Sequence, residues 1–71
     1  MYIVIELQVN ADGQLGNLVW AFDTLAQAES KYHGILSAAA VSQIPIHSAV
    51  ILDERGNVLM NASYDHPVEV E

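Results

Sequence analysis

The segment from Thr24 to Ser42 constrains the fold most, because it is the only stretch of the chain with the length and pattern of a full helix. Thr24 is placed as an N-cap with Gln27 as its capping-box partner, and Asp23 adds negative charge beside the positive end of the helix dipole. Apolar residues recur at spacings of three and four, which puts them on one stripe: Leu25, Ala28, Tyr32, Ile35, Leu36 and Ala39. The segment therefore predicts an amphipathic helix that packs along one face.

Four short strands are predicted around this helix from the alternation of side chains and from the turn signals between them. Their ranges are 1–9, 17–22, 46–52 and 57–64. An Asp-Gly signal closes the first hairpin within residues 10–16. Residues 53–56 close the second hairpin, with Gly56 expected in the left-handed region.

The order is therefore ββαββ, and the expected fold class is α+β: an antiparallel sheet of two hairpins with one helix packed on one face. Residues 1–64 are expected to form a single domain. Residues 65–71 read as an acidic C-terminal tail that frays.

A single helix covers one face of such a sheet, so the second face of a monomer should be polar. The strands are too apolar for that: one side of the first strand is entirely apolar, and Tyr2 and Val4 lie opposite it, so the second face is not polar enough. The chain has 71 residues, 52% of them hydrophobic, and no cysteine to staple a small core. We therefore expect a homo-oligomer, a dimer or a higher closed assembly, in which the second face or a sheet edge is buried between copies.

Charge limits the partners. Lys31 and Arg55 are the only strong cations against nine carboxylates, for a formal charge of −7, so the Lys and Arg clusters that bind nucleic acid are absent. The acids are scattered, which favours a role in solubility over mimicry of DNA phosphates. The first residues lack a basic signal-peptide region, and Glu6 and Gln8 interrupt any spanning helix, so we expect a cytoplasmic protein without a membrane partner.

Histidines are the first candidates for chemistry, but the spacing of His33, His47 and His66 matches no metal motif. Ser42 and Ser48 flank His47 without a nucleophile elbow. The chain is therefore expected to have no catalytic residues, no metal, no cofactor and no enzymatic activity. A small enzyme that uses His33 or His47 as a base is the remaining alternative.

Aromatic and basic residues suggest a ligand site instead. An aromatic ring beside a cation suits stacking and charge pairing with a nucleotide-like anion. The candidate ligand-binding residues are Trp20, Lys31, Tyr32, His33, His47 and Arg55. The competing interpretation is structural: Lys31 pairs with a nearby acid, Tyr32 belongs to the core and Trp20 packs under the helix.

Three motifs carry a resemblance to a known group of proteins: Tyr32-His33, the run from Ala38 to Ser42, and Pro45-x-His47-Ser48-Ala49-Val50. Together they resemble a pattern in short proteins encoded by phages and prophages of Gram-positive gut bacteria, over residues 28–52 and more loosely at 5–8 and 11–13. The resemblance brings no assigned activity. It implies a protein made inside an infected bacterium, where small phage proteins commonly inhibit host defence enzymes or capture their nucleotide signals.

Together these observations predict a non-enzymatic, homo-oligomeric binding protein. It would act stoichiometrically, either by blocking a host protein or by sequestering a nucleotide-like signal in a pocket between subunits. The alternative is a structural component of a virion or of a larger complex, in which the apolar face docks on another polypeptide.

Overall fold

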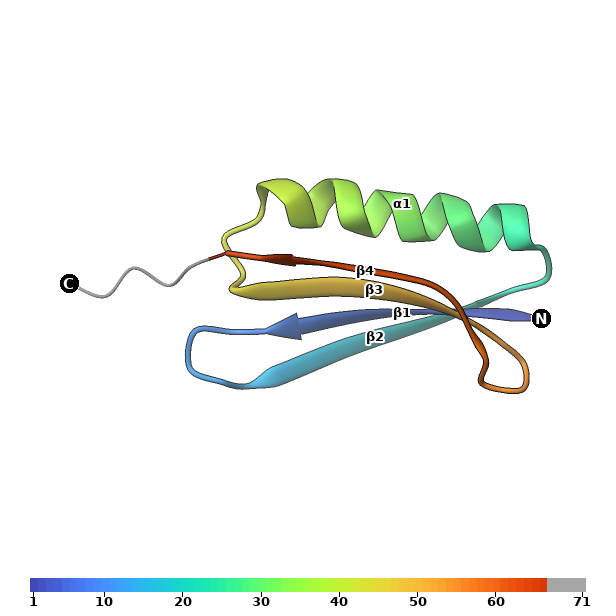
Figure 1. The fold of residues 1–71 in the computed structure, drawn as a ribbon, viewed down its shortest axis with the longest axis horizontal. Helices are drawn as coiled ribbons and strands as arrows, with labels where there is room; N and C mark the ends of the chain where they lie inside the picture. The colour runs from blue at the N-terminus through green and yellow to red at the C-terminus, as the bar shows by residue number, and fades with distance from the viewer. Residues whose placement is uncertain (67–71) are drawn as a thin grey trace.

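The computed structural model describes residues 1–66 and contains four strands and one helix in the order ββαββ (Figure 1). The elements are β1 (Tyr2–Val9), β2 (Leu15–Phe22), α1 (Leu25–Val41), β3 (Ile46–Asp53) and β4 (Val58–Asp65). The strands form one antiparallel sheet in the order β2-β1-β3-β4, and α1 packs along one face of it. The predicted α+β class, with two hairpins and one covering helix, is confirmed.

The C-terminal boundary differs from the prediction. Asp65 is the last residue of β4, where it pairs with Ile46, and the backbone N–H of His66 donates to the Pro45 carbonyl at 2.6 Å. Asp65 and His66 therefore belong to the folded domain, because this pairing extends the ladder past Tyr64. The rest of the predicted tail, residues 67–71, lies outside the described residues.

The N-cap of α1 is the residue predicted from the sequence, whereas, among the described residues, no hydrogen bond to the Gln27 side chain completes the predicted capping box. Thr24 Oγ1 accepts a hydrogen bond from the Gln27 backbone N–H at 3.2 Å, which satisfies one of the free donors of the first turn. Four members of the predicted stripe are buried: Ala28, Tyr32, Ile35 and Ala39. Leu36 packs against this core, whereas Leu25, in the first turn, is exposed.

The two faces of the sheet differ in burial. On the helix side, Val4, Ala49 and Ile51 are fully buried. On the other side, the alternate residues of the central strands β1 and β3 are half-buried or exposed. We call this side the open sheet face; its apolar members are Ile3, Ile5, Leu7, Val9, Leu15, Val19, Ala21, Ile46, Val50, Leu52 and Val58.

The orientation of β1 is the reverse of what the sequence pattern suggested. The sequence pattern placed Tyr2 and Val4 on the uncovered face, but in the structure they point to the helix. The entirely apolar side of β1 is the side that α1 does not cover. The reason is connectivity. β2 and β3 both pair antiparallel with β1, so they run in the same direction and α1 is a crossover between them. The handedness of a crossover, and not the apolarity of a face, decides which face the helix covers.

Asp53 organises the β3–β4 turn. The Asn57 side-chain amide donates to its Oδ2 at 2.8 Å, and the backbone N–H groups of Asn57 and Arg55 donate to Oδ1 at 2.9 and 2.8 Å. These hydrogen bonds, that from the Asn57 side chain above all, lower the pKa of the Asp53 carboxyl below its ordinary value of 3.8. Gly56 has a φ of +85°, the left-handed conformation predicted for it.

Candidate ligand-binding site

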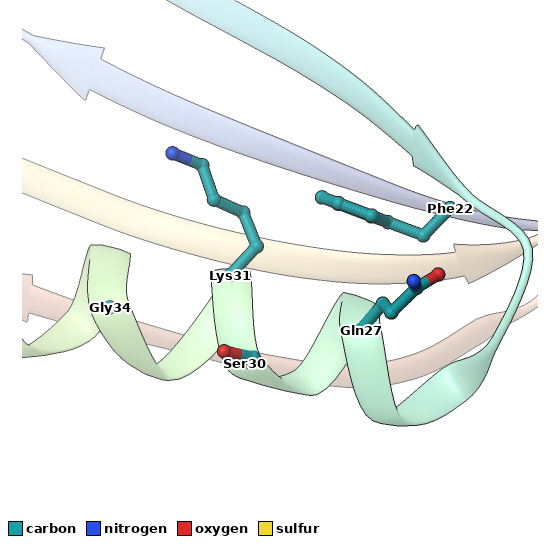
Figure 2. A pocket seen from close by; sticks show the side chains of 5 residues that line it. All are labelled: Phe22, Gln27, Ser30, Lys31 and Gly34. Carbon is teal, nitrogen blue, oxygen red and sulfur yellow. The ribbon is translucent and has the colours of Figure 1, made fainter.

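A groove lies between α1 and the edge strand β2. α1 packs chiefly over β3, in the middle of the sheet, so the helix-side residues of β2 are only partly covered. The hollow measures about 440 Å³ and is lined by Phe22, Gln27, Ser30, Lys31 and Gly34. Figure 2 shows Phe22 reaching from β2 and Lys31 from α1 into this space, with Gln27 turned toward Phe22. We call it the α1–β2 groove.

Lys31 occupies a defined position in this groove. Its Nζ lies 4.0 Å from the centroid of the Trp20 ring, a distance at which a cation–π interaction is favourable. Within residues 1–66 Lys31 stands in no ion pair. The described residues therefore do not contain the ion pair that the structural interpretation expected between Lys31 and a nearby acid. An ammonium held by an aromatic ring still has donors for an anion.

Gly34 forms the far end of the groove on α1. A Cβ atom added there would meet no heavy atom within 4 Å, so this glycine does not serve the close approach of a neighbouring backbone. Its effect is local: α1 contributes no side chain to this end of the groove, and the glycine weakens the helix. The groove is open to solvent along this flank of the helix.

The structure brings together two of the six predicted ligand residues, Trp20 and Lys31. Tyr32 is 3% exposed, belongs to the core, and its pKa is raised above the ordinary value by burial. His33 is exposed on α1, with its ring 5.3 Å from that of Tyr32. Arg55 lies in the β3–β4 turn, on the other half of the sheet from β2. The sequence did not identify Phe22, Gln27 and Ser30 as ligand-binding residues, because they line the groove only through the packing of α1 beside β2.

His47, the last of the six, belongs to a separate polar network under the C-terminal end of α1. Its Nε2 lies 2.5 Å from Glu6 Oε2 and its Nδ1 lies 3.3 Å from Ser42 Oγ. The Gln8 side-chain amide donates to the same Glu6 oxygen at 3.2 Å. His47 itself is 3% exposed, and the other members of the network, Glu6, Gln8 and Ser42, are half-buried.

The network joins three elements of the fold: β1, β3 and the C-terminal end of α1. When the His47 Nε2–H donates to Glu6, its Nδ1 is an acceptor 3.3 Å from Ser42 Oγ. The single hydroxyl hydrogen of Ser42 can be donated either to this nitrogen or to the Ala39 carbonyl. Ser42 also ends α1, because its backbone N–H and its hydroxyl both lie within hydrogen-bond distance of the Ala39 carbonyl, at 3.3 and 3.2 Å. The arrangement ties β1 and β3 to the end of the helix.

Sequence reasoning singled out Ser42 and His47 but missed Glu6. A usable signal was present, since Glu6 and Gln8 are the polar positions on an otherwise apolar strand and a covered carboxylate needs a partner. Strand order was the missing information. His47 reaches Glu6 only because β3 lies beside β1, where His47 pairs with Gln8.

His66 completes this end of the molecule. Its Nε2 lies 2.8 Å from the Ala39 carbonyl, so it adds a donor to the C-terminal end of α1. His47 and His66 thus both lie at the C-terminal end of α1, whereas His33 is exposed on the helix. Over residues 1–66, no three side chains of the metal-binding types come together in a way that could hold a metal ion.

Comparison with known proteins gives no relative: no family model, no curated protein and no solved structure matches the chain significantly. In the described part of the chain, α1 does not have the length and apolarity needed to cross a membrane. Function is therefore argued from the geometry and chemistry of the site itself.

Proposed function

We propose that the chain is a non-enzymatic binding protein that captures a small anionic ligand with a planar ring in the α1–β2 groove. One observation carries the proposal: Lys31, one of two strong cations in the chain, holds its ammonium over Trp20 and forms no ion pair with the described carboxylates. In a protein of formal charge −7, such a position is where an anion is attracted rather than repelled.

The residues around the groove offer three complementary contacts. Lys31 supplies a compact positive charge for a phosphate or carboxylate. Phe22 supplies aromatic surface against which a planar ring packs, and Trp20 holds the Lys31 ammonium in place. Gln27 and Ser30 add hydrogen-bond donors and acceptors on the helix flank. A nucleotide-like molecule carries the matching groups.

The charge of the groove also ranks the ligands. A single lysine in a strongly acidic protein neutralises one negative charge, and each further charge on the ligand is repelled by the carboxylates around it. We therefore expect cyclic nucleotides, with one charge on each phosphodiester, to bind more tightly than nucleoside triphosphates.

The test is calorimetry of the purified chain against cyclic nucleotides, ADP-ribose derivatives and nucleoside triphosphates. Two variants form a matched pair, Lys31→Gln and Arg55→Gln, because each removes one positive charge and only the first lies in the groove. Loss of a charge-assisted hydrogen bond should weaken binding about tenfold or more in Lys31→Gln. Arg55→Gln should bind like the unmodified chain.

Absence of heat from the whole panel would contradict capture of a small ligand. It would favour the second version of the same proposal, in which the chain blocks a host protein. Equal weakening in both variants would also count against the groove, since it would show a general effect of net charge. The resemblance to phage and prophage proteins supports stoichiometric action, because small phage proteins commonly act by binding host enzymes or their nucleotide signals.

A further inference from the structure

The open sheet face is the largest feature that the proposed ligand groove does not use. Its central members lie on β1 and β3, and none of them is buried, whereas the helix-facing Val4, Ala49 and Ile51 of the same strands are fully buried. Exposed apolar members include Val19 at 60%, Leu15 at 64% and Val58 at 56%. We propose that this face is the interface of a homodimer, in which the sheets of two copies pack face to face.

The chemistry of the face selects an apolar partner. Along β1, β2 and β3 it carries no charged side chain, and its other members there are Asn17 and Ser48. Among the described acidic residues only Asp65 lies on it, at the end of the edge strand β4. Facing copies therefore bring uncharged surfaces together while the other described acids stay on the helix side and in turns. A bilayer with anionic lipids is a poorer match, since the chain has a formal charge of −7.

The size of the face fits a dimer. Each strand has eight residues and the sheet has four strands. At about 3.3 Å per residue and about 4.8 Å between strands, the face covers roughly 26 Å by 19 Å, or about 500 Å². Two such faces remove about 1,000 Å² even as flat surfaces, which reaches the size that a specific interface requires. Side-chain relief adds to this area.

The register gives the face a regular central row of residues. Val19, Ile5, Val50 and Asn61 are direct cross-strand neighbours and form one row across all four strands. Two such sheets can pack about 10 Å apart with their strands nearly aligned, as in a β-sandwich. A two-fold axis through this row would place each row against its copy, which is the self-complementary contact that a symmetric dimer needs.

This dimer is independent of ligand binding. The α1–β2 groove lies on the helix side of the sheet, and the interface lies on the other side. Each subunit then keeps a complete, solvent-accessible groove, so the ligand site is within one subunit and not between two. Failure of ligand binding would leave the dimer proposal standing, and the reverse also holds.

Neighbouring residues of β2 provide the test. Val19 lies on the open sheet face and Leu18 on the helix side, and their exposed fractions are similar, 60% and 54%. Val19→Lys and Leu18→Lys make the same change of charge, and similar changes of size, on one strand. Light scattering should give 15.4 kDa, twice the 7.7 kDa of the chain, for the unmodified protein and for Leu18→Lys. Val19→Lys should weaken dimerisation about tenfold or more and shift the mass toward the monomer.

Circular dichroism checks that both variants fold, which their exposed positions favour. Isotope-filtered NOEs between the methyl groups of two subunits give a second readout without mutation, and should connect Ile5 and Val50 across the interface. A 7.7 kDa mass for the unmodified protein at its highest soluble concentration would overturn the proposal and leave the face to another polypeptide or a lipid surface. Equal dissociation of both variants, or of neither, would overturn it too, because the contact would then lie elsewhere.

Discussion

His47 Nε2 and Glu6 Oε2 lie 2.5 Å apart beneath the C-terminal end of α1, although 41 residues separate them in the chain. Their side chains are 4% and 13% exposed, so water competes little with this contact. A buried polar pair costs free energy when one partner is removed, because the remaining group loses its hydrogen bond without regaining water. The pair therefore fixes how β3 and the end of α1 sit against β1.

The first prediction concerns this pair. Glu6→Leu keeps similar bulk but leaves the His47 Nε2 without an acceptor, and should lower the free energy of unfolding by about 1–3 kcal/mol. Glu6→Gln retains an oxygen that can accept the same hydrogen bond and should cost less. Urea unfolding followed by circular dichroism, at one protein concentration, measures both.

Glu54→Leu is the control for that series. Glu54 is 72% exposed and its contact with the N-terminal amine, at 3.8 Å, is a surface ion pair of little energetic value. Its replacement should change the free energy of unfolding by less than about 0.5 kcal/mol. If Glu6→Leu were as neutral as Glu54→Leu, the network would contribute no stability.

The second prediction compares two glycines. Neither Gly34 nor Gly56 has a heavy atom within 4 Å of an added Cβ, so steric contact affects neither replacement. Gly34→Ala should raise the free energy of unfolding by about 1 kcal/mol, since alanine has the higher helix propensity. Gly56→Ala should lower it by about 1–2 kcal/mol, because an L-residue at φ +85° adopts the unfavourable left-handed conformation.

The opposite signs are the decisive part of this comparison. Thermal unfolding of both variants and of the unmodified chain shows whether each replacement stabilises or destabilises the fold. A destabilising Gly34→Ala would show that the helix needs the space above this residue, contrary to the clearance found there.

The third prediction is a pH dependence that arises from Asp53. Its carboxyl pKa is lower in the folded protein than the ordinary 3.8, so the ionised form is favoured by folding. The resulting stabilisation is fully present above 3.8 and is lost as the pH falls through the lowered pKa. Asp53→Ala should therefore be less stable than the unmodified chain at neutral pH, and the difference should shrink in strong acid.

The urea midpoints of Asp53→Ala and of the unmodified chain, measured from neutral pH to strong acid, give the comparison. Glu54→Ala, in the same turn, controls for the loss of one acidic charge. A gap between Asp53→Ala and the unmodified chain that stays constant down to the lowest pH would contradict the role assigned to the ionised carboxylate.

Local signals were sufficient for much of the fold. Thr24 with Gln27 located the start of α1, and spacing of three and four found its buried stripe, because capping and helical periodicity act over a few residues. Gly56 was assigned its left-handed conformation because few other residues adopt it easily. Strand ends were less well placed: β2 begins at Leu15, two residues before the prediction, because hairpin pairing extends a strand beyond its own pattern.

Local sequence signals identified only part of the candidate ligand-binding site. Lys31 and Trp20 were recognised as residues of the right chemical kind, and the fold brings Lys31 Nζ to 4.0 Å from the centroid of the Trp20 ring. His47 and Arg55 were grouped with them by chemistry alone, and they lie elsewhere. Phe22 entered the groove through the packing of α1 beside β2, a contact between elements that no local pattern encodes.

The amino-acid sequence by itself determined the elements, their order and an excess of apolar side chains, because each follows from periodicity and composition within a segment. Only the tertiary structure decided where that excess lies. The crossover from β2 to β3 places α1 over Val4 and Ile51 and leaves Ile5 and Val50 uncovered. Alternation specifies two faces of a strand, but the direction in which the chain passes over the sheet determines which of them meets the helix.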